Sequence, residues 1–341
     1  MGLSVTRFAA LFLLGISIRA AVAQDAPSSL PPEKVNPQAS HDAAVVELDR
    51  LETLDADDIT ASSMEALNRH IAALQTTEPS HPRLTYLFAR AFALSGRTKD
   101  AIEQLRRFVE TREGRTEWEA HRRLGDLFVD EFPQLAKASY HRAAELKAGE
   151  PTVLLGLSNC SYKLGRLDEA VGIAKDAADA DGRKSVRVVS HLARMLIAKQ
   201  SWPDADRAAT LAMELADAQV KAHPGQRAPL RVIDAQCKLT VDLLQARIAD
   251  RSAGAEDFLR LAALFRKRND LATTLNLHEC LRILEAGVNA SGETPSPKLL
   301  AEYARMLAEV GRTADAIAAY EKLLALEPQN VAAAEQIRKL R

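Results

Sequence analysis

The chain has 341 residues, of which 47% are hydrophobic and 5% aromatic, and its formal net charge is −1. This hydrophobic content excludes global disorder, and the near-neutral charge argues against nucleic acid as a general partner, because such partners require a strongly basic surface. Ala and Leu are abundant and aromatic residues few, which favours helices over strands.

The first 23 residues match a secretory signal peptide. Arg7 precedes an apolar run from Phe8 to Ile18, and Ala21 and Ala23 give the small-x-small cleavage pattern. The alternative is a membrane anchor, but a spanning helix needs about 20 apolar residues, and Arg19 ends this run early. We therefore expect cleavage after Ala23, no membrane span in the mature chain, and a periplasmic or secreted location, since the Ala- and Arg-rich usage is typical of bacteria.

A flexible linker is expected over residues 24–42, which hold four prolines and no apolar periodicity. A short helix should cover residues 43–54. Ser62 and Glu65 have the spacing of a capping box for the next helix, which should run through Leu74. Acidic residues exceed basic ones from Gln24 to Pro82, which we interpret as a solvated acidic segment.

Helical patterns then follow one another in pairs over residues 83–216. The turns between the members of each pair lie at Gly96, at Phe132-Pro133, at Gly165 and at Gln200. Thr98 and Ser201 are the expected caps of two of the second helices.

Small residues recur one turn into each second helix. They are Ala66, Ala101, Ala136, Ala170 and Ala205, at intervals of 35, 35, 34 and 35 residues. A small side chain is needed where two helices cross closely, because a larger one would force them apart. The spacing therefore predicts that residues 43–216 form a stack of similar hairpins.

The pattern returns near the C-terminus after an irregular stretch. Residues 217–296 are helical but lose the period, and form either degenerate repeats or a local insertion; Gly287 to Pro297 is expected to be a loop. Residues 297–341 form another hairpin around Gly311, with Ala316 lying 111 residues after Ala205. A short helix over residues 331–340 should cap the array, which argues against self-association through an exposed end.

These features resemble the tetratricopeptide repeat (TPR) family, whose unit is a helix-turn-helix of 34 residues. The matching positions are the small pairs Ala89 with Ala101, Ala193 with Ala205 and Ala304 with Ala316, the turn glycines, Tyr140, Tyr320 and Pro328. Gln200 departs from the pattern, because it stands at the turn position that Gly96, Gly165 and Gly311 hold in their hairpins. The resemblance implies an all-α, right-handed solenoid of stacked antiparallel hairpins.

In this family the first helix of each hairpin lines a concave groove. The resemblance therefore implies partner contacts from ten residues: Arg83, Tyr86, Arg90, Asn159, Tyr162, Lys163, Arg187, Arg194, Lys298 and Arg305. Most are cationic or amphipathic, which suits an acidic or extended protein segment. The family's carboxylate-clamp arrangement is not reproduced, since Leu155 and Gly156 occupy positions where polar residues are expected.

No motif predicts catalysis, a cofactor or a metal. Gly287 and Gly292 are spaced as in a phosphate-binding loop, but Glu293 stands where lysine is needed. The three cysteines are expected to be buried thiols, with a Cys237–Cys280 disulfide as the alternative. We therefore expect a non-enzymatic interaction scaffold in a bacterial cell envelope. The alternative is an enzyme or small-ligand-binding protein that uses a pocket in residues 217–296.

Overall fold

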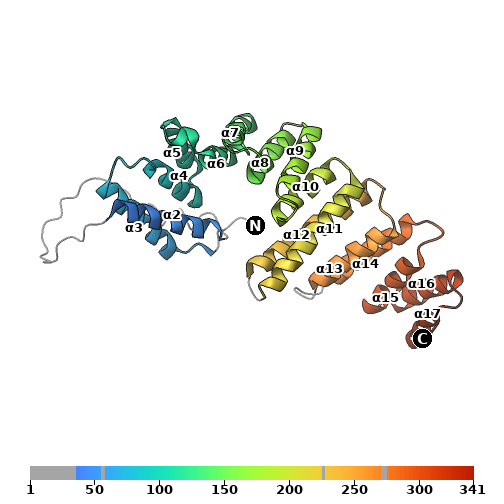
Figure 1. Ribbon diagram of the computed structural model, residues 1–341. Helices are drawn as coiled ribbons and strands as arrows, with labels where there is room; N and C mark the ends of the chain where they lie inside the picture. The colour runs from blue at the N-terminus through green and yellow to red at the C-terminus, as the bar shows by residue number, and fades with distance from the viewer. Residues whose placement is uncertain (1–35, 55–57, 225–226, 270–274) are drawn as a thin grey trace, which may run out of the picture. The chain divides into compact units, whose positions relative to one another are not determined.

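The computed structural model describes residues 36–54, 58–224, 227–269 and 275–341, and every regular element within them is a helix (Figure 1). The predicted signal peptide and most of the predicted linker lie outside the described residues. The chain divides into two compact units, which are described separately: unit 1 comprises Met1–Ala148 and unit 2 comprises Gly149–Arg341. None of the described helices is both long and apolar enough to cross a membrane.

Unit 1 consists of three antiparallel helix pairs, in which each helix packs mainly on the next one in the chain. Its elements are α2 (Pro37–Glu52), α3 (Ala61–Thr77), α4 (Leu84–Leu94), α5 (Thr98–Glu110), the short 3-10 helix η2 (Gly114–Thr116), α6 (Trp118–Phe128) and α7 (Pro133–Leu146).

Unit 2 continues the same up-and-down order. Its elements are α8 (Pro151–Lys163), α9 (Leu167–Ala180), α10 (Val186–Ala198), α11 (Trp202–Ala222), α12 (Arg227–Ala249), α13 (Ala255–Asn269), α14 (Leu275–Ala290), α15 (Pro297–Glu309), α16 (Thr313–Leu326) and α17 (Val331–Leu340). The first helices of neighbouring pairs also contact each other, as α8 does with α10 and α13 with α15.

The first two helices begin at different residues from those predicted. The end of the expected linker is helical, because α2 begins at Pro37 and the Asn36 side chain accepts a hydrogen bond from the Gln38 backbone N–H at 3.1 Å. A proline suits the first turn, where its missing N–H would have no helical partner. The N-cap of α3 is Thr60, which accepts from the Ser63 N–H, so the expected Ser62 capping box is wrong.

The small residues lie at helix crossings, as their spacing predicted. Five alanines of the second helices are completely buried: Ala101, Ala136, Ala170, Ala205 and Ala316. Their expected partners Ala89, Ala193 and Ala304 are buried as well. The exception is Ala66, which is only partly buried while the adjacent Leu67 is fully buried. The repeat register therefore fits every hairpin tested except the first.

Four of the turn residues share one backbone conformation, whereas Phe132 at the turn before α7 has a φ of −132°. Gly96, Gly165 and Gly311 have φ angles of 71°, 75° and 81°, in the left-handed region that glycine enters without a Cβ clash. Gln200 occupies the equivalent turn with φ 59°. This departure from the repeat pattern changes the residue but keeps the turn geometry.

The irregular stretch is part of the stack of unit 2. α11 and α12 are 21 and 23 residues long, against 13 or 14 for the helices of the preceding pairs, and they pack along each other. α12 contributes Leu239 and Leu243 to the core shared with α8–α11, and Val241 and Leu244 to the core that continues through α17. It therefore joins the two cores.

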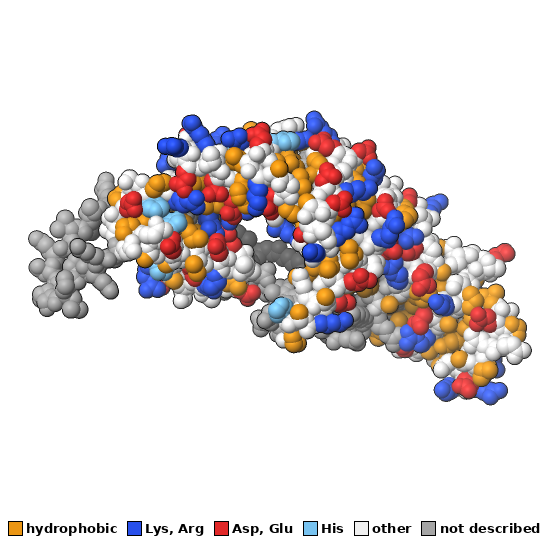
Figure 2. Space-filling model, in the orientation of Figure 1, with side chains coloured by type: hydrophobic (Ala, Val, Ile, Leu, Met, Phe, Trp, Pro, Cys, Tyr) orange, Lys and Arg blue, Asp and Glu red, His pale blue; other side chains and the backbone are white. Residues whose placement is uncertain are grey.

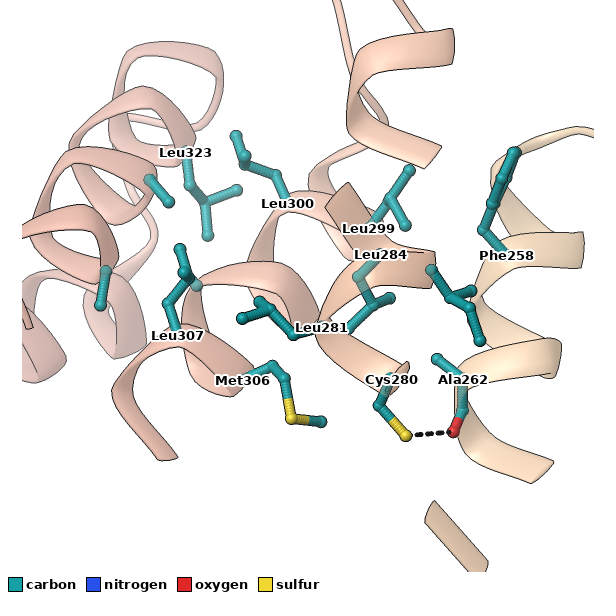
Figure 3. Packing of buried hydrophobic residues seen from close by; sticks show 14 of the residues in the cluster. Phe258, Ala262, Cys280, Leu281, Leu284, Leu299, Leu300, Met306, Leu307 and Leu323 are labelled. Atoms are coloured by element: carbon teal, nitrogen blue, oxygen red, sulfur yellow. Dashed lines mark hydrogen bonds between the residues drawn. The ribbon is translucent and has the colours of Figure 1, made fainter. Parts of the chain in front are cut away.

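The second of these cores is drawn in Figure 3, where side chains from α13, α14, α15 and α16 point into a common interior. The Cys280 thiol donates to the Ala262 carbonyl at 3.3 Å, and all three cysteines are buried thiols that form no disulfide. The alternative Cys237–Cys280 bridge is therefore wrong. Gly287 lies inside α14, and it packs closely on α13. A Cβ at this position would come within 2.7 Å of the Phe258 ring. This close packing explains a glycine that we had expected to begin a loop.

Candidate partner-binding face

Arg90 of α4 is an internal residue of unit 1. Its side chain is 5% exposed, and its guanidinium donates to both carboxylate oxygens of Glu52 at 2.9 and 3.0 Å and to Asp49 at 2.5 Å. Both acidic residues come from α2. A buried cation requires such pairing, because an isolated buried charge is costly.

Arg123 of α6 holds the same carboxylate. Its two terminal nitrogens donate to the Glu52 oxygens at 2.8 and 2.7 Å, and one of them also donates to Glu119 at 2.8 Å. Burial alone would raise the pKa of Glu52, but the hydrogen bonds from Arg90 and Arg123 outweigh it and the pKa lies below its ordinary value. Glu52 is therefore clamped in its ionised form by two bidentate arginines, which tie α2 to α4 and α6.

Tyr86 and Arg83 are also engaged within unit 1. Tyr86 is 4% exposed, its ring stacks on Phe108 with centroids 4.9 Å apart, and burial raises its pKa to about 12. Arg83 pairs with Glu113 and, at 3.1 Å, with Glu117. These contacts correct the sequence prediction for unit 1: Tyr86 and Arg90 are buried, and the charge of Arg83 is neutralised by the chain itself.

Unit 2 presents a different electrostatic arrangement on α8 and α10. Neither helix contains an Asp or Glu. Arg187 and Arg194 of α10 are exposed. Among the described side chains neither forms an ion pair, and the one protein hydrogen bond from these two guanidinium groups runs from Arg194 Nε to the Ser190 carbonyl at 3.4 Å. Both cations are therefore available to a carboxylate outside the chain.

α8 supplies the neighbouring positions. Tyr162 is 45% exposed, Lys163 is exposed and Asn159 is partly buried. Residues three and four apart lie on one face of a helix, so Asn159, Tyr162 and Lys163 share a surface. We call the surface of Asn159, Tyr162, Lys163, Arg187, His191 and Arg194 the α8–α10 face.

His191 joins the two helices of this face. Its Nε2 lies 2.8 Å from the Ser158 hydroxyl of α8, and that hydroxyl donates to the Ala170 carbonyl at 2.8 Å. Burial, with the charges of Arg194 and Arg187, lowers the pKa of His191 to about 4. The ring is therefore neutral at physiological pH. Sequence reasoning missed it because a single histidine among apolar residues gives no signal of its own.

Lys298 and Arg305 of α15 lie apart from the α8–α10 face in the chain. Lys298 is exposed, whereas Arg305 pairs with Glu302 and, at 3.5 Å, with Glu309 on its own helix. Basic and acidic side chains are intermixed over the surface drawn in Figure 2. Like α4, the helices α8 and α10 carry no acidic residue, but no described carboxylate from another helix pairs with Arg187 or Arg194.

A pocket between the ends of α10 and α12 bears on the alternative small-ligand function. Its volume is about 440 Å³, and it is lined by Ile197, Ala198, Gln200, Trp202, Ala246, Ala249 and Asp250. Asp250, the one acidic residue of this lining, already accepts a hydrogen bond from the Trp202 indole at 2.9 Å. The pocket brings no set of ionisable groups together.

Comparisons with known proteins bear on the fold. No family model and no curated protein matches the chain. Among solved structures, PilF of Pseudomonas aeruginosa is 14% identical and covers 71% of this chain and 96% of its own, with a TM-score of 0.51. PilW, described as a widely conserved type IV pilus biogenesis factor, is 14% identical and covers 72% of this chain and 99% of its own, with a TM-score of 0.53. These similarities agree with the hairpin packing and the buried alanines, and confirm that the chain has the tetratricopeptide-repeat fold.

Proposed function

We propose that the chain is a non-enzymatic protein-interaction scaffold that holds an acidic or extended segment of a partner protein on the α8–α10 face. One observation carries the proposal: Arg187 and Arg194 are exposed on a pair of helices without acidic residues, and no described carboxylate pairs with them. In unit 1, by contrast, Arg83 and Arg90 are paired with carboxylates of the chain itself.

The chemistry of the face suits such a segment. Arginine forms charge-assisted, bidentate hydrogen bonds with carboxylates. Tyr162 offers a ring that is 45% exposed and can pack on a partner side chain. The Asn159 amide has both a donor and an acceptor, which suits the main chain of an extended segment. Lys163 adds positive charge at the edge of this surface.

The setting that we propose is the bacterial cell envelope. Support comes from the expected signal peptide with cleavage after Ala23, and from the fold that the chain shares with PilW, a type IV pilus biogenesis factor. In this proposal residues 43–216 and 297–341 are the repeat modules, residues 217–296 are degenerate repeats that bridge them, and the helix at residues 331–340 covers the last hairpin.

Site-specific photo-cross-linking in the native cells tests the proposal. A photoreactive phenylalanine analogue replaces Tyr162, and in a matched control it replaces Lys175, which is exposed on α9 outside the α8–α10 face. We expect Tyr162 to yield a discrete adduct with another protein, identified by mass spectrometry, and Lys175 to yield none. Equal adducts from both positions, or adducts only with a second copy of the chain, would overturn the proposal.

A further inference from the structure

The hydrogen bonds around His191 fix the position of its proton. The Ser158 hydroxyl has one proton, and it donates this proton to the Ala170 carbonyl. The hydroxyl must therefore accept from His191 Nε2, 2.8 Å away. The neutral ring consequently carries its hydrogen on Nε2 and a lone pair on Nδ1.

The Nδ1 atom is not completely enclosed, although the His191 side chain is only partly exposed. Of the side chains that the structure describes, none donates a hydrogen bond to it, and it is not among the buried polar atoms that lack a partner. Arg187 lies four residues before His191 and Arg194 three residues after it, so all three share one stripe of α10. A carboxylate bound between these arginines would lie next to Nδ1.

The charged side chains that act on the ring are all positive. From its own helix, Arg194 and Arg187 disfavour a positive ring. From α8 it faces Ser158, with Tyr162 and Lys163 one turn further on. The groups that α9 and α12 contribute to this network are neutral: the Ala170 carbonyl, which accepts from Ser158, and the Gln236 amide, which accepts from Ser190. No described carboxylate, on α11 or elsewhere, acts on the ring.

We propose that His191 is a further partner-binding residue of the α8–α10 face, and that capture of an acidic segment is accompanied by uptake of one proton at its Nδ1. This inference rests on the proposed function. A carboxylate placed between Arg187 and Arg194 offsets their repulsion of a positive ring and accepts a hydrogen bond from the new Nδ1–H. The proton comes from solvent, so binding strengthens as the pH falls.

The size of the effect follows from the two protonation equilibria. The pKa of His191 is about 4 in the free protein and its ordinary value is 6.5. If the bound carboxylate restores the ordinary value, affinity at pH 5.5 exceeds affinity at pH 7.5 by about tenfold. Glutamate side chains stay largely ionised over this range, so the ligand itself contributes little to the change.

The probe is a fluorescently labelled hexaglutamate, and its binding to the full chain is measured by anisotropy at pH 7.5 and pH 5.5 at constant ionic strength. The matched variant is His191→Gln, whose side-chain N–H can still donate to Ser158 but cannot titrate. We expect about a tenfold gain at pH 5.5 for the wild type and less than a twofold change for the variant, with circular dichroism showing that both remain folded.

A second measurement uses the wild type alone, and therefore tests the role of His191 even if the His191→Gln variant does not fold. Calorimetry at pH 5.5 in buffers of different ionisation enthalpy counts the protons taken up when hexaglutamate binds, and we expect about one. Binding without proton uptake, or an equal pH response in the variant, overturns the role of His191 and leaves the proposed face standing. Absence of hexaglutamate binding at either pH contradicts both proposals.

Discussion

Replacement of Glu52 by Gln tests the account of unit 1 most sharply, because this one carboxylate holds two buried arginines. The variant keeps the side-chain shape but removes the charge that Arg90 and Arg123 share. Loss of one partner of a buried ion pair costs about 3–5 kcal/mol. Glu52 is 23% exposed, and Asp49 and Glu119 still contact the two arginines. We therefore expect unit 1 to lose about 2–3 kcal/mol of its free energy of unfolding.

The matched control is Glu103→Gln, which removes an exposed carboxylate from the same unit. Glu103 pairs with Arg107 one turn away on α5, with side chains 57% and 61% exposed. Exposed pairs of this kind contribute about 0.5 kcal/mol or less. The comparison therefore separates the effect of losing a negative charge from the effect of opening the buried clamp.

The two tryptophans make the assay specific to each unit. Trp118 lies in α6 of unit 1 and Trp202 in α11 of unit 2, so Trp202→Phe and Trp118→Phe backgrounds each leave one reporter. Urea titrations monitored by fluorescence then measure the midpoint at each tryptophan. We expect Glu52→Gln to lower the midpoint reported by Trp118 far more than Glu103→Gln does. Equal, small losses from the two variants would refute the clamp.

Three further outcomes are expected. Ala316→Leu should cost about 1–3 kcal/mol by overpacking a helix crossing, since Ala316 is fully buried; an unchanged melting temperature by circular dichroism would show that the register is mistaken. The pKa of His191 is lowered from 6.5 to about 4, so its contribution to the free energy of unfolding is complete above pH 6.5. This contribution, up to about 3 kcal/mol, is lost as the pH falls from 6.5 through 4. Urea titrations across this range should show a weaker fall in His191→Gln. Gln200→Gly should stabilise the chain by about 0.5–1 kcal/mol because it relieves a left-handed backbone, whereas Gly311→Ala should destabilise it; urea midpoints that move in the same direction would contradict this reading of the turns.

The repeat architecture could be predicted from the sequence because its determinants are local. The spacing of small residues and the turn glycines depend on contacts between helices that follow each other in the chain. Ala101, Ala170 and Ala205 are accordingly buried where their spacing placed them. Gln200 shows the same point, because the turn keeps its conformation although the residue differs.

The pairing of the unit 1 arginines could not be predicted, because it depends on distant residues. Arg90 meets Glu52 and Asp49 from 38 and 41 residues away, and Arg83 meets Glu113 from 30 residues away. The repeat pattern places a side chain on a face of its helix, but it does not show whether another helix brings a carboxylate to that face.

Two glycines inside helices illustrate a further limit. Gly287 in α14 lies against Phe258, and Gly125 in α6 lies against the Tyr140 ring, where an added Cβ would come within 2.7 and 2.9 Å respectively. In the sequence a glycine reads as a helix end or a turn. These glycines are required by close packing against a neighbouring helix, which the sequence alone does not show. The sequence therefore predicted a loop from Gly287, whereas α14 continues to Ala290.

The central claim is that the charges of the α8–α10 face hold the partner, and charge reversal tests it most directly. The variant Arg187→Glu/Arg194→Glu is compared with Lys175→Glu/Arg207→Glu, which makes the same change in net charge at exposed positions of α9 and α11. Affinity for the protein cross-linked through position 162 is measured by titration calorimetry. The account predicts at least a hundredfold loss for the first variant and less than a threefold change for the second. Equal losses, or full affinity in the first variant, would contradict it.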